Sequence, residues 1–172
     1  MRKALVVIDV QNDFITGPLG NKECQGIIPN IIEKIKNTTD DIYITRDTHE
    51  ENYLKTQEGK KLPIPHCIIG TNGWEIVKEV EYELYKHASR TYVIKDTFGS
   101  KDLAEDMEKY NEIELIGVCT DICVISNALI IKAFNPEAKI VVDASCCAGV
   151  SPERHRNALE AMKACQIEII NE

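Results

Sequence analysis

The sequence has no basic cluster and no long apolar run. Of its 172 residues, 20 are Lys or Arg and 28 are Asp or Glu, which gives a net charge of −8. A protein that binds a phosphate backbone gathers Lys and Arg on one face, so we expect no nucleic-acid partner. Anionic membrane surfaces are disfavoured for the same reason. No segment approaches the ~20 apolar residues that a membrane span requires.

We also expect no secretory leader, and the chain shows no repeats, low-complexity stretches or domain linker. The first apolar run, Ala4 to Ile8, ends at Asp9 and is too short for the core of a signal peptide. We therefore expect a cytoplasmic protein that forms a single domain over residues 1–172. Seven cysteines are many, but the odd number and the spacings match no disulfide framework, so most are expected to be small buried apolar residues.

What the chain does have is an alternation of short apolar runs rich in Val and Ile with amphipathic segments. Short, nearly continuous apolar runs are typical of parallel strands covered on both faces. We predict an α/β fold, a single-domain three-layer α-β-α structure with an open, mostly parallel six-stranded sheet. The predicted strands cover residues 4–9, 41–45, 90–94, 112–117, 139–143 and 167–170, and the predicted helices 28–37, 73–83, 100–109, 121–134 and 152–165.

Polar or reactive residues follow five of the predicted strands. They are Asp9, Asp47, Lys95, the turn from Cys119 to Cys123, and Asp143. Open parallel sheets bind their ligands outside the carboxyl ends of the strands, so we expect these groups to gather at one edge.

The run Gly-Val-Cys-Thr-Asp-Ile-Cys-Val at residues 117–124 reads as strand, tight turn and helix. Cys123 would lie in the first helical turn, where exposed N–H groups and the helix dipole favour a thiolate. Asp9 is a candidate general base for that thiol, and Lys95 a cation between the two, as in a triad recognised by roles. The alternatives are a strand-end cap for Asp9, a surface position for Lys95, and a redox pair formed by Cys119 and Cys123.

The long irregular segment at residues 46–72 contains a second candidate site. Asp47-Thr48-His49, then Glu58 and then His66 supply carboxylates and imidazoles, which suit Zn²⁺, Fe²⁺ or Mn²⁺. A connection of this length inside a compact domain is usually functional.

These motifs resemble the isochorismatase-like cysteine hydrolases and, within them, the nicotinamidase (pyrazinamidase) branch. The resemblance rests on Val-Ile-Asp-Val-Gln-Asn-Asp-Phe at 7–14, on Lys95, and on the run at 117–124. It implies that Cys123 is the nucleophile, Asp9 the base and Lys95 the third member of a triad. It also implies a cis peptide before Cys119 and an oxyanion hole made of the backbone N–H groups of Cys119 and Cys123. The family usually has alanine where this chain has Cys119.

The resemblance further implies one divalent metal ion, held by Asp47, His49, Glu58 and His66, with Zn²⁺ expected first and Fe²⁺ or Mn²⁺ as alternatives. The ion would bind the pyridine nitrogen of the substrate. Phe14 matches an aromatic residue that packs on the ring. A second aromatic wall is expected at a position where this chain has Pro63, and Phe98 is a candidate to supply the missing contact. We group Phe14, Pro63 and Phe98 as substrate-binding residues.

The activity implied is hydrolysis of nicotinamide to nicotinate and ammonia through a thioester, a reaction of NAD salvage. One alternative is a related amidohydrolase that acts on another small amide, carbamoyl or ureido compound and does without a metal. A second alternative is a non-catalytic protein that binds metal or uses Cys119 and Cys123 as a redox sensor. The expected partner is a small-molecule amide, and association into a homo-oligomer is left open.

Overall fold

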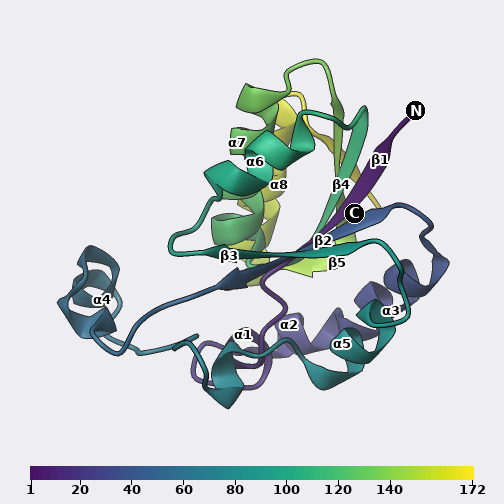
Figure 1. Ribbon diagram of the computed structural model, residues 1–172. Helices are drawn as coiled ribbons and strands as arrows, with labels where there is room; N and C mark the ends of the chain where they lie inside the picture. Colours follow the sequence, from purple (N-terminus) through teal and green to yellow (C-terminus); the bar gives the residue numbers. More distant parts are fainter.

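The computed structural model describes residues 1–172, which form one open sheet between two layers of helices (Figure 1). All six strands are parallel, in the order β3-β2-β1-β4-β5-β6. The predicted fold class is confirmed. The strands are β1 (Lys3–Ile8), β2 (Asp41–Asp47), β3 (Arg90–Lys95), β4 (Glu112–Val118), β5 (Lys139–Ala148) and β6 (Glu168–Ile170).

Helices α6, α7 and α8 cover one face of the sheet, and α1, α2, α3 and α5 cover the other (Figure 1). The apolar clusters on the two faces contain 23 and 21 buried residues, so both faces are buried to a similar extent. Their bounds are α1 (Asn12–Ile15), α2 (Lys22–Gly26), α3 (Ile28–Asn37), α5 (Lys78–Leu84), α6 (Lys101–Met107), α7 (Ile125–Phe134) and α8 (Pro152–Ala164).

Local sequence signals explain where the later helices begin. Ser100 Oγ accepts a hydrogen bond from Leu103 N at 3.1 Å, and Ser151 Oγ accepts one from Arg154 N at 3.2 Å. Each serine therefore caps its helix, α6 or α8, by satisfying a free N–H of the first turn. Proline at the first position of α8 fits because that N–H needs no partner.

The segment between β2 and α5 differs most from the sequence prediction. It contains the 3₁₀ turn η1 (Tyr53–Lys55), helix α4 (Gln57–Lys61) and the 3₁₀ turn η2 (Asn72–Trp74), and α5 begins at Lys78 instead of residue 73. In Figure 1 this segment extends well beyond the sheet, with α4 at its far end. Contacts between these short elements and distant residues determine their bounds, so the helical pattern alone placed the start of α5 too early.

The sheet contains a point where the direction of strand addition reverses. β2 and β3 lie on one side of β1, whereas β4, β5 and β6 lie on the other. In open parallel sheets the crevice at this reversal, beyond the carboxyl ends of the strands, is where ligands bind. The chain segments that leave β1 and β4 meet at this crevice.

Gly117 lies beside Ile8 of β1 at this crevice, where there is no room for a side chain. It pairs with Ile8 in register and has φ of 120°, a conformation that L side chains rarely adopt. A Cβ atom at this position would lie 2.1 Å from the Ile8 carbonyl oxygen.

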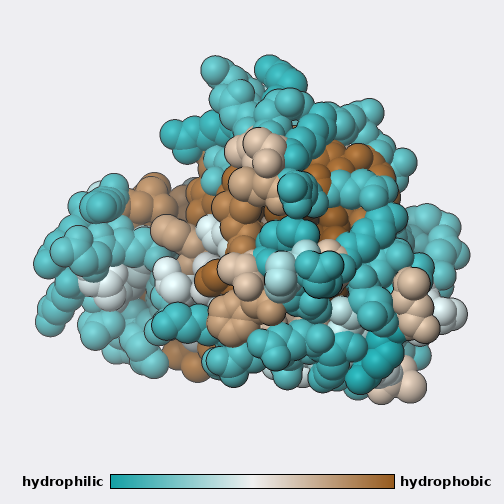
Figure 2. Space-filling model, turned by 90° about the horizontal axis from the view of Figure 1, so that it is seen from above, coloured by the Kyte–Doolittle hydropathy of each residue, from teal (hydrophilic) through white to brown (hydrophobic).

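The face seen in Figure 2 is mostly hydrophilic, with apolar side chains exposed in areas between the hydrophilic ones. None of the helices combines the length and apolar character needed to cross a bilayer.

Candidate active site

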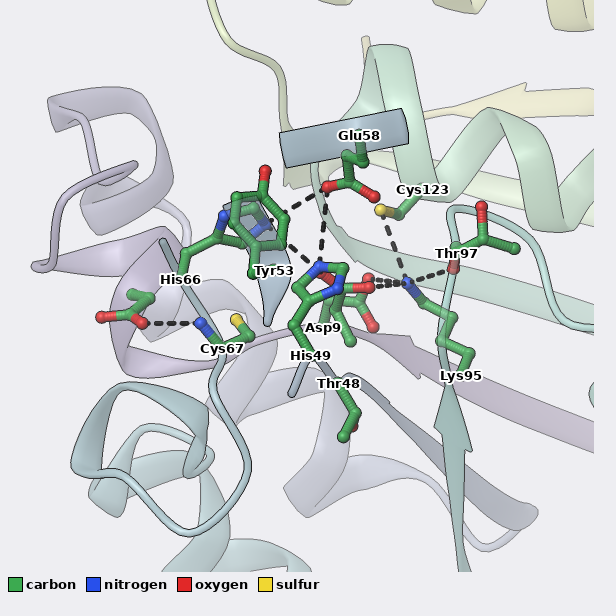
Figure 3. Close-up of polar contacts among 12 residues, drawn as sticks. Asp9, Thr48, His49, Tyr53, Glu58, His66, Cys67, Lys95, Thr97 and Cys123 are labelled. Atoms are coloured by element: carbon green, nitrogen blue, oxygen red, sulfur yellow. Dashed lines mark hydrogen bonds and ion pairs between the residues drawn. The ribbon is translucent and has the colours of Figure 1, made fainter. Parts of the chain in front are cut away.

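Lys95, the last residue of β3, lies at the centre of a buried polar cluster (Figure 3). Its Nζ lies 2.6 Å from Asp9 Oδ2 and 3.2 Å from Asp47 Oδ1, and it donates a hydrogen bond to the Thr97 carbonyl oxygen at 3.0 Å. Cys123 Sγ lies 3.6 Å from the same ammonium group. Burial alone would lower the pKa of Lys95, but Asp9, Cys123 and Asp47 raise it above its ordinary value, so the side chain is charged.

Asp9 directly follows β1 and is completely buried. Its φ of 49° turns the chain sharply at the end of the strand. Thr45 of β2 holds it twice: the hydroxyl donates to Asp9 Oδ1 at 2.5 Å and accepts from Asp9 N at 3.1 Å. Burial raises the pKa of Asp9, and the charge of Lys95 and the Thr45 hydrogen bond oppose that rise. A carboxylate with a raised pKa is suited to accept a proton and to return it.

Cys123 lies in η3 (Thr120–Val124), a π-helical turn between β4 and α7. The sequence predicted this residue in the first turn of an α-helix, as a thiolate. The structure places it in a π-helical turn instead. Burial raises the pKa of Cys123 well above its ordinary value and the Asp9 charge raises it further, whereas the Lys95 charge lowers it. A thiol whose pKa is raised needs a base to activate it. The peptide bond before Cys119 is cis, as the resemblance implies.

Asp47, His49, Glu58 and His66 form a second cluster beside the first. One oxygen or nitrogen from each lies within 4.8 Å of all the others. His49 Nε2 lies 3.0 Å from Asp47 Oδ2 and 3.5 Å from Glu58 Oε1, and His66 Nε2 lies 3.5 Å from each of the same two oxygens. The structure thus brings together the four predicted metal ligands.

The donor set of this cluster fits a divalent ion. The Ile64 carbonyl oxygen accepts a hydrogen bond from His66 Nδ1 at 2.8 Å, which leaves the lone pair of Nε2 directed at the carboxylates. The four imidazole–carboxylate separations, 3.0 to 3.5 Å, leave the ligand atoms close enough to share one divalent ion. Two imidazoles and two carboxylates are ligands that zinc and iron both accept.

Tyr53 of η1 is a packing residue of this cluster that the sequence analysis did not identify. Its ring centroid lies 4.8 Å from that of His49 and 5.0 Å from that of His66, and its hydroxyl donates to the Leu62 carbonyl oxygen at 2.8 Å. The side chain is almost fully buried although it lies in a loop segment, and a large aromatic residue in such a segment was the available signal. Phe14 contacts the other side of His66, with ring centroids 5.5 Å apart.

A cavity of about 270 Å³ joins the two clusters. Its size is at the lower end for small-molecule sites, which suits a compound of about one ring. Phe14 and Phe98, both predicted as substrate-binding residues, line it. The full set of lining residues is Phe14, Leu19, Asp47, Glu58, Leu62, His66, Phe98, Cys119, Ile122, Cys123, Val150 and Arg154.

The prediction for Pro63 is wrong. Pro63 is exposed and does not line the cavity, whereas its neighbour Leu62 does. The chain is extended at this point, so adjacent side chains point in opposite directions. The wall is aliphatic here, formed by Leu62 with Leu19 and Val150, which sequence spacing did not reveal.

Asp143 is also not where the sequence analysis placed it. It lies inside β5, which continues to Ala148, and it does not reach the cavity. Its carboxylate pairs with Lys34 of α3 at 2.7 Å and accepts a hydrogen bond from Ser145 Oγ at 2.7 Å. An aspartate interrupts an apolar run but not the strand, because the buried charge is neutralised by a neighbouring helix.

Comparisons with known proteins agree with the fold and identify the family. The family model described as the isochorismatase domain matches residues 3–172. The uncharacterized isochorismatase family protein PncA of Bacillus subtilis is 30% identical, over 92% of this chain and 93% of its own length.

Two solved structures share the fold and 28% of the sequence. The nicotinamidase/pyrazinamidase PncA from Bacillus subtilis superposes with a TM-score of 0.86, covering 99% of this chain and 100% of its own. The pyrazinamidase of Pyrococcus horikoshii in complex with zinc gives a TM-score of 0.79 and covers 100% of both chains.

Proposed function

The chain belongs to the isochorismatase family of hydrolases, and from that premise we propose that it hydrolyses nicotinamide to nicotinate and ammonia. The observation that carries the proposal is the contact of Cys123 with Lys95, the partner of Asp9, at a cavity that the cluster residues Asp47, Glu58 and His66 also line. Relatives that are nicotinamidases and pyrazinamidases at 28% identity support this substrate class.

In the first half of the reaction, the Asp9 carboxylate removes the proton of the Cys123 thiol, and the sulfur attacks the carboxamide carbon. Lys95 stabilises the thiolate as it forms, because its ammonium lies 3.6 Å from the sulfur. The backbone N–H groups of Cys119 and Cys123 hold the oxyanion of the tetrahedral intermediate. Asp9 then gives its proton to the departing ammonia, and a thioester on Cys123 remains.

In the second half, Asp9 takes a proton from water, and the resulting hydroxide attacks the thioester carbonyl. The carbon–sulfur bond breaks, nicotinic acid is released and ionises to nicotinate, and the proton held by Asp9 returns to the Cys123 sulfur. Only one carboxylate is needed, because Asp9 is ionised again at the end of each half of the reaction. Nicotinate produced this way would enter NAD salvage.

The four-residue cluster would hold one divalent ion, with zinc as the first expectation. When bound, that ion supplies a Lewis-acid partner for the pyridine nitrogen. Phe14 packs one face of the ring, and Phe98 lies near the mouth of the cavity, so the carboxamide points toward the sulfur. Orientation of this kind raises the reaction rate by holding the reacting atoms in contact.

The rival substrate is a small linear amide, carbamoyl or ureido compound. The aliphatic wall of Leu19, Leu62 and Val150 would accept such a molecule as readily as a ring. A metal cluster that lines the same cavity as the nucleophile favours the cyclic amide, because a linear amide offers no aromatic nitrogen to bind there.

The test is to incubate the purified protein with nicotinamide, pyrazinamide and a ureido compound, and to measure ammonia release and metal content on the same sample. We expect rapid release from the two ring amides and about one metal ion per chain. Rapid quenching followed by mass spectrometry of the peptide that contains Cys123 should reveal the acyl group. Turnover of the ureido compound alone, without bound metal, would support the rival. A protein with no turnover of any amide would support a thiol or metal-binding role.

A further inference from the structure

The segment that follows β1 contains two polar residues whose function the reaction does not explain. In Val-Ile-Asp-Val-Gln-Asn-Asp-Phe, the proposed mechanism uses Asp9 and Phe14 but leaves Gln11 and Asp13 without a role. Gln11 is completely buried. Both side chains reach toward the metal cluster, where each one binds the backbone of a ligand or of its neighbour.

Gln11 holds the backbone of Asp47 at two points. Its Nε2 donates to the Asp47 carbonyl oxygen at 2.8 Å, and its Oε1 accepts from Asp47 N at 2.8 Å. The same Nε2 donates to the Trp74 carbonyl oxygen at 2.9 Å. The pairing of β1 with β2 ends at Val7 and Ile44, so beyond this point the side chain of Gln11 replaces the missing strand partner of Asp47.

Asp13 holds the turn that carries His66. Its Oδ2 accepts a hydrogen bond from Cys67 N at 2.8 Å. Cys67 has φ of 47°, and its carbonyl oxygen accepts from His49 N at 3.0 Å, so this residue links the two histidine ligands through the backbone. A hydrogen bond at this strained position fixes the backbone turn and, with it, the direction in which the His66 side chain points.

The Asp13 carboxylate packs closely against Gly17 and Gly73. A Cβ atom at Gly73 would lie 2.1 Å from Oδ2, and one at Gly17 would lie 2.5 Å from Oδ1. The carboxylate is therefore packed directly against two glycine backbones. A side chain held this tightly defines a position for the group it binds.

We propose that Gln11 and Asp13 are positioning residues of the metal site. Neither touches the ion or the substrate. Gln11 fixes Asp47, and Asp13 fixes the His66–Cys67 turn, so that the four ligand atoms converge. The proposal rests on metal binding by the cluster, which is part of the proposed function, and it does not depend on which amide is hydrolysed.

Asp9, Gln11 and Asp13 stand at every second position of this segment, and this spacing has a consequence for the reaction. Asp9 is the proton acceptor, and Gln11 and Asp13 hold the metal side, so a single stretch of five residues sets the distance between the base and the ion. Loss of either positioning residue should therefore weaken metal binding and raise KM, while kcat at saturating metal and substrate changes much less.

The experiment measures zinc affinity by competition with a chromogenic chelator, together with the unfolding temperature of the metal-free protein. Partners of metal ligands typically contribute 10–100-fold to affinity, and we expect Gln11→Met and Asp13→Ala each to raise the zinc dissociation constant by about this factor. Asp13→Asn keeps the shape and an acceptor oxygen, so it should restore most of the affinity.

Asn12→Ala is the matched control. Asn12 lies between the two positioning residues, and its Nδ2 donates to the Asn72 carbonyl oxygen at 2.8 Å, away from any ligand. Its replacement should leave the zinc dissociation constant unchanged. If Gln11→Met does not fold, Gln11→Glu removes the donor, keeps the acceptor and allows the same comparison.

Three outcomes would overturn the proposal. Unchanged zinc affinity in both the Gln11 and Asp13 variants would mean that these residues do not position the ligands. Equal weakening of zinc binding in Asn12→Ala would mean that the segment acts only through general stability. A lower unfolding temperature of the Gln11 and Asp13 variants, with the same zinc affinity as the wild type, would mean the same. Absence of zinc binding by the wild type would remove the metal site itself, whereas ammonia release from nicotinamide tests the proposed reaction separately.

Discussion

The triad and the metal cluster lie side by side but are built in different ways. Asp9 and Lys95 come directly from the ends of β1 and β3, and Cys123 lies in the turn after β4, so the sheet fixes all three. Of the four metal ligands, only Asp47 belongs to a strand. The other three lie in the segment between β2 and α5, which is held by side-chain hydrogen bonds and by the packing of Tyr53.

Burial separates the two groups only at Glu58. The side chains of Asp9 and Lys95 are 0% and 1% exposed and those of His66 and His49 are 2% and 7% exposed, whereas that of Glu58 is 18% exposed. Positions set by paired strands are hard to change, and loop positions can be adjusted without disturbing the core. In this molecule the bond-making groups are in the rigid part, and the groups that would orient the substrate are in the adjustable part. The following predictions test this division, from the largest expected effect to the smallest.

Cys123→Ala should lower the rate of ammonia release from nicotinamide by at least ~10⁴-fold, because no other group can form the thioester. Zinc content should remain that of the wild type, since the sulfur belongs to the triad and not to the metal cluster. Cys119→Ala serves as the control, because only the backbone N–H of that residue is used. Substantial release from Cys123→Ala would show that the nucleophile has been misassigned.

Lys95→Met should damage both clusters at once. The substitution removes the cation between Asp9 and Asp47, so two buried carboxylates lose their positively charged partner. Loss of one partner of a buried ion pair typically lowers the free energy of unfolding by about 3–5 kcal/mol. Turnover should fall on the order of 10²–10⁴-fold as the base and thiolate lose their partner. Urea unfolding and ammonia release measure the two effects. A fully stable variant with a normal rate would mean that the two clusters are independent.

His66→Ala should lower zinc affinity by at least about 10-fold and raise KM, yet leave the triad intact. Iodoacetamide should therefore alkylate Cys123 in this variant at nearly the wild-type rate. His87→Ala, which changes a histidine that does not line the cavity, is the control. If alkylation of Cys123 slows as much as zinc binding weakens, the separation of the clusters drawn here is wrong.

Thr45→Val should move the acid limb of the pH profile of kcat/KM to higher pH. Asp9 acts as a base only when ionised, so activity falls as the pH drops through its pKa. The Thr45 hydrogen bond lowers the pKa of Asp9, and its removal leaves the rise caused by burial less opposed. Serine at this position should keep the wild-type profile. An unshifted acid limb in the valine variant would assign that limb to another group.

Asp143→Asn should affect stability but not activity. Burial raises the pKa of Asp143, but the hydrogen bonds from Lys34 and Ser145 outweigh burial and lower it. The folded pKa lies below the unfolded value, so this stabilisation is present above about pH 4 and is lost as the pH falls through the folded pKa. We expect about 1–3 kcal/mol lower stability at pH 7 and a much smaller difference near pH 2. Equal losses at both values would indicate a packing effect.

The same division explains what the sequence could predict. Strand ends are visible as apolar runs that stop at a polar residue, and this pattern located Asp9, Asp47 and Lys95 at one edge of the sheet. It failed for Asp143, because the Lys34 partner that allows a charge inside β5 is more than a hundred positions away in the chain.

The loop side was harder to predict because its conformation depends on distant contacts. The side-chain types of Asp47, His49, Glu58 and His66 made them candidate ligands, and the family resemblance turned the candidates into an expected set. The wall at Leu62 and the packing of Tyr53 were missed. Gln11 and Asp13 were quoted in a motif, but nothing in their spacing indicates which backbone groups they bind. Those contacts join segments more than thirty residues apart, which local periodicity cannot report.

The contact between Gly117 and the Ile8 carbonyl oxygen has one more consequence. Here the two backbones lie in contact with no side chain between them, and any residue larger than glycine would push β1 and β4 apart. That displacement would move the Cys123 sulfur, in the turn after β4, away from the Asp9 carboxylate at the end of β1. The distance that the proton must cross between sulfur and carboxylate therefore depends on a position that carries no methyl group.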